Sequence, residues 1–124
     1  MDTNIALLAV GTPERLSAAA RSTVEKGPCF ISVVSYWEVI LKAMKGSLDV
    51  VDPRQWWSET LDGLELRVLP LRPEHIAAIY HLPAIHQDPF DRALIAQAIV
   101  EGLTLLTTDG TIPRYESDRF RTLA

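Results

Sequence analysis

Short apolar segments alternate with helical repeats along this chain, and the alternation limits the possible folds more than any other feature. The segments Cys29–Val34, Leu64–Leu69 and Leu103–Leu106 have the length and the apolar or β-branched content of strands. Between them, apolar residues recur at spacings of three and four, as on one face of a helix. Strands without a polar face are buried on both sides, so the pattern predicts a mostly parallel sheet covered by helices on both faces.

Proline and glycine indicate where the predicted helices begin and end, because proline suits a first helical turn and glycine suits the residue after a last one. The predicted helices run from Pro13 to Gly27, from Trp37 to Gly46, from Asp52-Pro53 to Gly63, from Pro73 through Tyr80, and from Asp88-Pro89 to Gly102. A chain of 124 residues is long enough for one hydrophobic core, so we expect a single domain over residues 1–124.

The composition narrows the class of protein. A net charge of −4 gives no general attraction to nucleic acid, so RNA binding would need a local basic patch or a bound metal. The single cysteine, Cys29, forms no intramolecular disulfide, which fits a reducing compartment. The sequence shows no signal-peptide pattern and no apolar run of membrane-spanning length. We therefore expect a cytoplasmic protein that does not contact the membrane.

Four acidic residues lie near the predicted strand ends or helix starts. Glu38 and Asp109 follow predicted strands, and Asp91 lies in the first turn of the last predicted helix. Asp2 completes the set if it also follows a strand. In open parallel sheets, ligands bind beyond the carboxyl ends of the strands, so we expect the four acids to converge on one rim.

Each acid taken alone has a simpler structural explanation. Glu38 matches a capping box with Ser35, and Asp91 interacts favourably with a helix dipole. Asp109 suits a turn, and Asp2 is a terminal residue. Taken together, clustered carboxylates repel one another, and a divalent cation removes that repulsion. Oxygen ligands favour Mg²⁺ or Mn²⁺ over Zn²⁺, and such a site is suited to phosphodiester hydrolysis.

Four motifs occur in the order found in a known family. They are Asp2-Thr3-Asn4, Ser35-Tyr36-Trp37-Glu38-Val39, His86-Gln87-Asp88-Pro89-Phe90-Asp91-Arg92 with Leu94-Ile95-Ala96-Gln97-Ala98, and Thr107-Thr108-Asp109. With these motifs the chain resembles the PIN domain of VapC-type toxins over nearly its whole length. The resemblance implies a three-layer α/β/α sandwich around a mostly parallel sheet. It also implies an endoribonuclease that uses Mg²⁺ or Mn²⁺, forms a homodimer, and is neutralised by a small antitoxin protein.

The resemblance assigns roles to individual residues, and the implied metal ligands and catalytic acids are Asp2, Glu38, Asp91 and Asp109. Of these, Glu38 is expected to hold a metal-bound water or a second ion. Asn4 and Thr107 match polar positions that orient the acids through hydrogen bonds. Asp88 matches a helix cap. Arg92 is expected either to pair with a neighbouring carboxylate or to contact phosphate.

One departure from the family concerns the start of the chain. In the family a short apolar strand precedes the Asp2-Thr3-Asn4 motif, whereas only Met1 precedes it here. A strand needs about five residues, so we expect the first strand of the sandwich to be missing or truncated and Asp2 to be weakly anchored. A neighbouring chain would then be able to supply a strand to the exposed edge.

Two other functions stay open at this point. A catalytically weak PIN-like module that mainly binds an antitoxin partner agrees with the missing strand, whereas the intact Asp91 and Asp109 motifs oppose it. A metal-dependent DNA nuclease would use the same acids.

The remaining cationic residues have less specific patterns. His75 and His81 are expected on helix surfaces, and His86 is expected near the acidic segment without acting as a general base. A phosphate-binding rim and ordinary solvated charge both remain possible for Lys42, Lys45, Arg114, Arg119 and Arg121.

Overall fold

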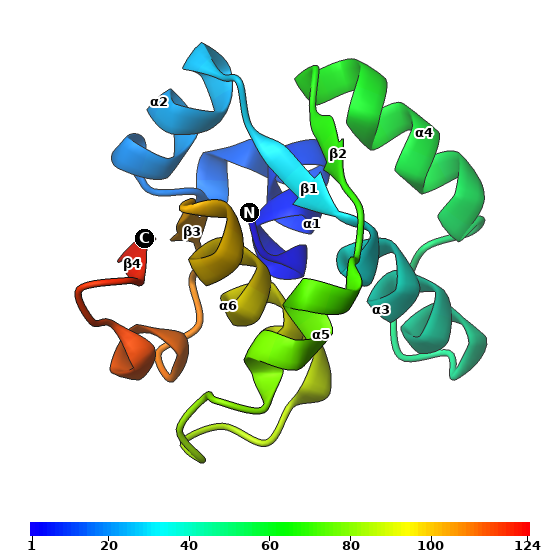
Figure 1. Ribbon diagram of the computed structural model, residues 1–124. Coiled ribbons are helices and arrows are strands. Elements are labelled where there is room, and N and C mark those ends of the chain that lie inside the picture. The colour runs from blue at the N-terminus through cyan, green and yellow to red at the C-terminus, as the bar shows by residue number, and fades with distance from the viewer.

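The computed structural model describes residues 1–124, and its helices surround two short pairs of strands (Figure 1). In chain order the helices are α1 (Thr3–Gly11), α2 (Ala18–Lys26), α3 (Val33–Met44), α4 (Pro53–Leu64), α5 (Pro73–Ile79) and α6 (Pro89–Glu101). The strands are β1 (Phe30–Ser32), β2 (Arg67–Leu69), β3 (Thr104–Leu106) and β4 (Arg121–Leu123), and the short 3-10 helices are η1 (Pro13–Arg15) and η2 (Ile112–Tyr115). The predicted alternation of helices and strands is confirmed. No helix is both long and apolar enough to cross a membrane.

The strands pair in parallel within two separate sheets. β1 pairs with β2, which sets Ile31 beside Val68, and β3 pairs with β4, which sets Leu105 beside Thr122. The predicted parallel pairing is therefore confirmed, whereas one continuous sheet is not formed and the three-layer sandwich stays a prediction. β4 lies in a charged tail in which the sequence pattern predicts no strand.

The first two residues lie between the two sheets, as the N-terminal label in Figure 1 indicates. The Met1 amine donates to the carbonyl oxygen of Phe30 in β1 at 2.9 Å. The backbone N–H of Asp2 donates to the carbonyl oxygen of Leu106 in β3 at 2.8 Å. These bonds connect β1 to β3 and bury Asp2, contrary to the expectation that it is weakly anchored.

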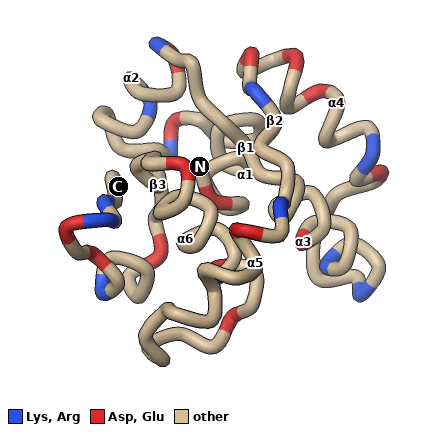
Figure 2. The backbone as a smooth tube through the Cα atoms, viewed as in Figure 1, with Lys and Arg blue, Asp and Glu red and all other residues tan.

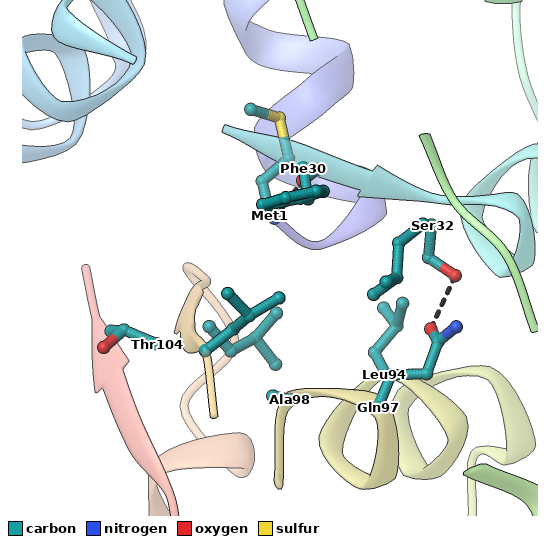
Figure 3. Close-up of a pocket in the computed structure, with 10 residues that line it drawn as sticks. Met1, Phe30, Ser32, Leu94, Gln97, Ala98 and Thr104 are labelled. Atoms are coloured by element: carbon teal, nitrogen blue, oxygen red, sulfur yellow. Dashed lines mark hydrogen bonds between the residues drawn. The ribbon is translucent and has the colours of Figure 1, made fainter. Parts of the chain in front are cut away.

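Two hollows flank Met1 where β1 and β3 face each other. One, of about 30 Å³, opens toward Leu94 of α6 (Figure 3), and the other, of about 230 Å³, lies beside Thr23 of α2. We call the space between the two strands the inter-sheet slot, and both hollows are lined by Met1, Phe30, Leu103 and Thr104. β1 and β3 each have one strand neighbour, so no strand pairs with the edges that face the slot.

Three apolar clusters hold the helices around the strands. The largest surrounds α6 and contains Ile95 and Phe120, which are both fully buried. The second packs α1 against α2 around Ile5, and the third joins α1, α3 and α4 around Val39 and Trp56. Burial of each large apolar side chain contributes about 1.5–3 kcal/mol. The clusters therefore fix α1, α3 and α6, whose caps or first two turns carry acids of the candidate site.

Three helix ends differ from the prediction, each for a local reason. α2 begins after Ser17 rather than at Pro13, because the Ser17 hydroxyl accepts a hydrogen bond from the first turn of the helix. α3 begins directly after Ser32, whose hydroxyl caps it, so β1 is shorter than the predicted strand. α4 passes through Gly63, and Glu65 takes the left-handed conformation at its end with a φ of 52°.

The expectation that His75 lies on the surface is wrong, because its side chain is fully buried. Its Nδ1 accepts from the backbone N–H of Arg72 at 3.0 Å, and its Nε2 lies 3.2 Å from Oε2 of Glu101. Both ring nitrogens thus have partners, which removes the main cost of burying an imidazole. His75 therefore links the start of α5 to the end of α6.

Candidate metal centre

One open cleft of about 440 Å³ lies where β1 and β3 end. Its lining includes the four acids singled out in the sequence, which are Asp2, Glu38, Asp91 and Asp109. They come from the N-cap of α1, the second turn of α3, the first turn of α6 and the loop after β3. The structure thus brings together acids that lie far apart in the chain, at the edge where parallel strands are expected to present ligands.

Asp2 is held through both of its carboxylate oxygens. Oδ1 accepts from the backbone N–H of Ile5 at 2.9 Å, which caps α1, and Oδ2 accepts from the Thr107 hydroxyl. The pKa of the Asp2 carboxyl is raised, mainly by burial and in small part by the nearby charge of Asp109. The hydrogen bonds from Thr107 and Ile5 lower this pKa but do not cancel the effect of burial. Thr107 therefore orients an acid, which is the kind of contact that the family resemblance implies for it.

Glu38 is held on both sides and is 5% exposed. Oε1 accepts from the Thr3 hydroxyl at 2.6 Å, and Oε2 lies 2.7 Å from Nζ of Lys42, one helical turn further along α3. The hydrogen bond to Glu38 raises the pKa of Lys42. The capping box with Ser35 is not formed, since α3 already begins two residues earlier and the Ser35 hydroxyl oxygen instead lies 3.0 Å from the Thr3 hydroxyl oxygen.

Asp91 lies in the first turn of α6, which Asp88 caps as predicted. Oδ1 of Asp88 accepts from the backbone N–H groups of Phe90 at 2.8 Å and Asp91 at 3.2 Å. Oδ2 of Asp91 lies 2.8 Å from Nε2 of His86. Burial first, and then the charge of Asp88, raise the pKa of Asp91 to about 6, although the His86 hydrogen bond lowers it. A cation therefore competes with a proton for this carboxylate near pH 6.

Asp109 keeps one carboxylate oxygen free of protein donors. Oδ1 accepts from the backbone N–H groups of Thr111 at 2.6 Å and Ile112 at 3.2 Å, so it closes the turn into η2. The backbone N–H of Asp109 donates to the Thr107 hydroxyl oxygen at 3.0 Å. Oδ2 accepts no hydrogen bond from the protein and is therefore available to a ligand.

Asn4 and Arg92 do not contact the acids. Asn4 borders the cleft, but its amide donates to the Thr108 hydroxyl at 2.8 Å rather than to a carboxylate. The pairing of Arg92 with a carboxylate is wrong, because its guanidinium donates to the backbone carbonyls of Ile79, Pro83 and His86. Of the two acids at the start of α6, Asp88 and Asp91 both border the cleft, and Asp91 also contacts His86.

The donor set fits a hard divalent cation. The cleft holds carboxylates and hydroxyl or amide oxygens, with Lys42 as its one cationic side chain. The charges of Glu38 and Asp109 add to the rise in the pKa of Asp91, after the larger effects of burial and Asp88. Oxygen ligands with excess negative charge match Mg²⁺ or Mn²⁺.

The positions of lysine and arginine are spread along the backbone and do not gather in one region (Figure 2). Lys42 and Lys45 lie at the end of α3, whereas Arg114 and Arg119 border a separate hollow of about 660 Å³ beside η2. In Figure 2 the end of α3 and the C-terminal segment lie on opposite sides of the molecule. The phosphate-binding rim considered above is therefore not formed as a single surface, and only Lys42 of that set borders the acidic cleft.

Comparison with known proteins decides the family. A family model described as the PIN domain matches residues 1–117. The chain belongs to the PIN-domain family. This PIN domain is 26% identical over 121 residues to ribonuclease VapC22 of Mycobacterium tuberculosis (strain ATCC 25618 / H37Rv). The aligned region covers 96% of this chain and 92% of that protein. Its fold is similar to that of a chain in the crystal structure of VapBC2 from Rickettsia felis bound to a DNA fragment from their promoter, with a TM-score of 0.68. The two chains are 18% identical, and the match covers 97% of this chain and 94% of the Rickettsia felis chain. The resemblance to VapC-type PIN proteins is thus confirmed.

Three residues that contact the acids of this PIN domain were not singled out for that contact in the sequence: Thr3, Lys42 and His86. Lys42 had a usable signal, because it follows Glu38 by four residues, the spacing at which opposite charges pair on a helix. Thr3 had none, since its contact depends on how α1 packs beside α3. His86 lies close to Asp91 in sequence, but only the path of the α5–α6 loop turns its side chain toward that residue.

Proposed function

We propose that this PIN domain is a divalent-metal-dependent endoribonuclease and the toxin component of a toxin–antitoxin pair. The observation that carries the proposal is the single cleft lined by Asp2, Glu38, Asp91 and Asp109. The name of the relative, a ribonuclease, and the VapBC complex with a similar fold support the class of function. The proposal includes a homodimer in the cytoplasm, with a small antitoxin protein as partner.

The residues of the cleft divide into metal-holding and orienting groups. Asp2, Asp91 and Asp109 would hold Mg²⁺ or Mn²⁺, which supplies a polarised water and neutralises charge on the phosphodiester. Glu38 orients the attacking water, and its bonds to Thr3 and Lys42 keep its carboxylate from rotating. The Lys42 side chain, 47% exposed, draws a phosphate toward the cleft.

We also propose that the two strand pairs are parts of one central sheet in a three-layer α/β/α sandwich. β1 and β3 bond to the adjacent residues Met1 and Asp2 and face each other across the inter-sheet slot. An extended segment in the slot would give a continuous sheet in the order β2, β1, segment, β3, β4.

Cleavage of RNA and of single-stranded DNA, measured side by side, tests the proposed reaction. The wild-type chain is expected to cleave RNA with Mn²⁺ and to lose this activity with a chelator. Asp109→Asn is expected to lower the rate by more than about 100-fold, since several kcal/mol of metal-dependent stabilisation are lost. The variant suits the test because the amide oxygen of Asn still accepts the bonds from Thr111 and Ile112.

Asp62→Asn, which changes an exposed acid on α4, is the matched control and is expected to cleave like the wild type. Equal cleavage by Asp109→Asn and the wild type would remove the proposed site. Faster cleavage of DNA than of RNA would overturn the substrate class. An absence of cleavage with retained antitoxin binding would instead favour the binding module.

A further inference from the structure

The loop that joins α5 to α6 is held in place by Arg92 and Tyr115. The Arg92 guanidinium donates to the carbonyl oxygens of Pro83 at 2.9 Å and His86 at 3.3 Å. The Tyr115 hydroxyl accepts from the backbone N–H of His86 at 2.6 Å and lies 3.3 Å from the Arg92 guanidinium. Both backbone groups of His86 are therefore bound, which fixes the position from which its side chain projects.

The His86 side chain contacts Asp91 from outside the acidic cleft. Its Nε2 lies 2.8 Å from Oδ2 of Asp91, and Asp91 borders the cleft whereas His86 does not. An imidazole that carries hydrogen on Nε2 donates to this oxygen in its neutral or its protonated form. Hydrogen bonds behind a metal ligand fix its orientation, and their loss commonly weakens metal binding.

We propose that His86 is a positioning residue that holds the Asp91 carboxylate toward the cleft, and that Arg92 and Tyr115 hold the loop that presents it. The inference rests on the metal centre proposed above and gives the hydrogen bonds of Arg92 to the loop a role. Single ligand atoms of His86, Asp88 and Asp91 lie within 4.8 Å of one another. A role of His86 as a direct metal ligand agrees less well with these contacts, because its Nε2 is bonded to Asp91 and Oδ1 of Asp88 caps α6.

Calorimetric titration with Mn²⁺ tests the positioning role through binding rather than turnover. His86→Leu removes the donor and is expected to weaken Mn²⁺ binding by about 10- to 100-fold. His86→Gln places an amide donor near the position of Nε2 and is expected to restore the affinity to within about fivefold of the wild type. The exposed His81 lies on the same connection, so His81→Leu is the matched control and is expected to bind like the wild type. The melting temperature of each metal-free variant checks that the fold is kept.

Tyr115→Phe tests the hold on the loop with the loss of a single oxygen. It leaves the backbone N–H of His86 without its acceptor and is expected to weaken Mn²⁺ binding in the same direction as His86→Leu. A lower melting temperature with unchanged Mn²⁺ affinity would contradict the role given to Tyr115.

Equal Mn²⁺ affinities of His86→Leu and the wild type would overturn the positioning role and leave the metal centre intact. A loss in His86→Gln as large as in His86→Leu would also overturn it, because a donor alone would then not account for the effect. No Mn²⁺ binding by the wild-type chain would contradict the proposed metal centre itself, so the two failures are distinguishable.

Discussion

Asp91→Asn is expected to make the metal-free protein more stable at pH 8 and to lower RNA cleavage by more than about 100-fold. The loss of cleavage follows from the loss of a charged metal ligand. The gain in stability follows from burial and the charge of Asp88, which raise the pKa of Asp91 to about 6. An ionised carboxylate at this position therefore disfavours folding, and a neutral amide of the same shape does not.

The sign of the pH dependence follows from where the proton is bound. Between the ordinary pKa of 3.8 and about 6, the folded protein holds a proton on Asp91 that the unfolded chain has released. The free energy of unfolding therefore decreases as pH rises through this window. The stabilising contribution is fully present below pH 3.8 and is lost as the pH rises through about 6. Because Asp91 is partly solvated, solvent screening reduces the effect. At pH 8 the free energy of unfolding of Asp91→Asn is expected to exceed that of the wild type by about 1 kcal/mol.

Thermal unfolding of the wild type and Asp91→Asn, with chelator present at pH 4 and pH 8, measures this difference. The variant is expected to melt higher than the wild type at pH 8 and close to it at pH 4. Added Mn²⁺ is expected to stabilise the wild type only, because an ion that binds the folded state alone shifts the unfolding equilibrium. A variant that is less stable by the same amount at both pH values would contradict the raised pKa.

An extended apolar segment joined ahead of Met1 is expected to raise the stability of the protein by about 2 kcal/mol, or about 5–10 °C in Tm. The inter-sheet slot has a mainly apolar hollow toward Leu94 of α6 (Figure 3). It has a second hollow beside Thr23 of α2. Alternate side chains of a strand would enter the two hollows, and its backbone would pair with the free edges of β1 and β3. The free energy gained from these contacts is expected to exceed the free-energy cost of the conformational entropy lost when about four residues become ordered.

Two extensions of equal length separate strand formation from a general effect of a longer chain. A segment of four apolar, β-branched residues is compared with a segment of alternating glycine and serine, both joined ahead of Met1. Only the apolar segment is expected to raise the melting temperature, and a proline in its middle is expected to reduce the gain because it removes a backbone donor. Equal melting temperatures for the two extensions would contradict the proposed central sheet.

The sequence predicted the elements that depend on local signals. The Asp88-Pro89 start and Gly102 end of α6 match the structure, because a side-chain cap and a left-handed residue act within a few positions. The parallel pairing of the strands was also predictable from the sequence, since strands without a polar face have to be covered on both sides. Features that depend on tertiary packing could not be predicted from the sequence. β4 forms where the C-terminal segment pairs with β3, and His75 is buried because Arg72 and Glu101 satisfy its ring.

The candidate site also has a part that the sequence predicts and a part that depends on tertiary packing. The convergence of Glu38, Asp91 and Asp109 was predictable from their positions at the ends of strands and the starts of helices. The contacts that orient them were only partly predictable, because the Thr3 and His86 bonds depend on helix packing and on the path of a loop. Charge pairing, one of the two roles considered for Arg92, is not observed for a related reason, since the sequence does not reveal the backbone carbonyls of a folded loop.

Anomalous diffraction from crystals soaked in Mn²⁺ tests most directly whether the gathered carboxylates hold a cation. The account predicts a manganese peak in the cleft that Asp2, Glu38, Asp91 and Asp109 line, within coordination distance of Asp91 and Asp109 or of waters bound to them. A cleft without such a peak, in crystals where manganese binds elsewhere on the protein, would contradict it.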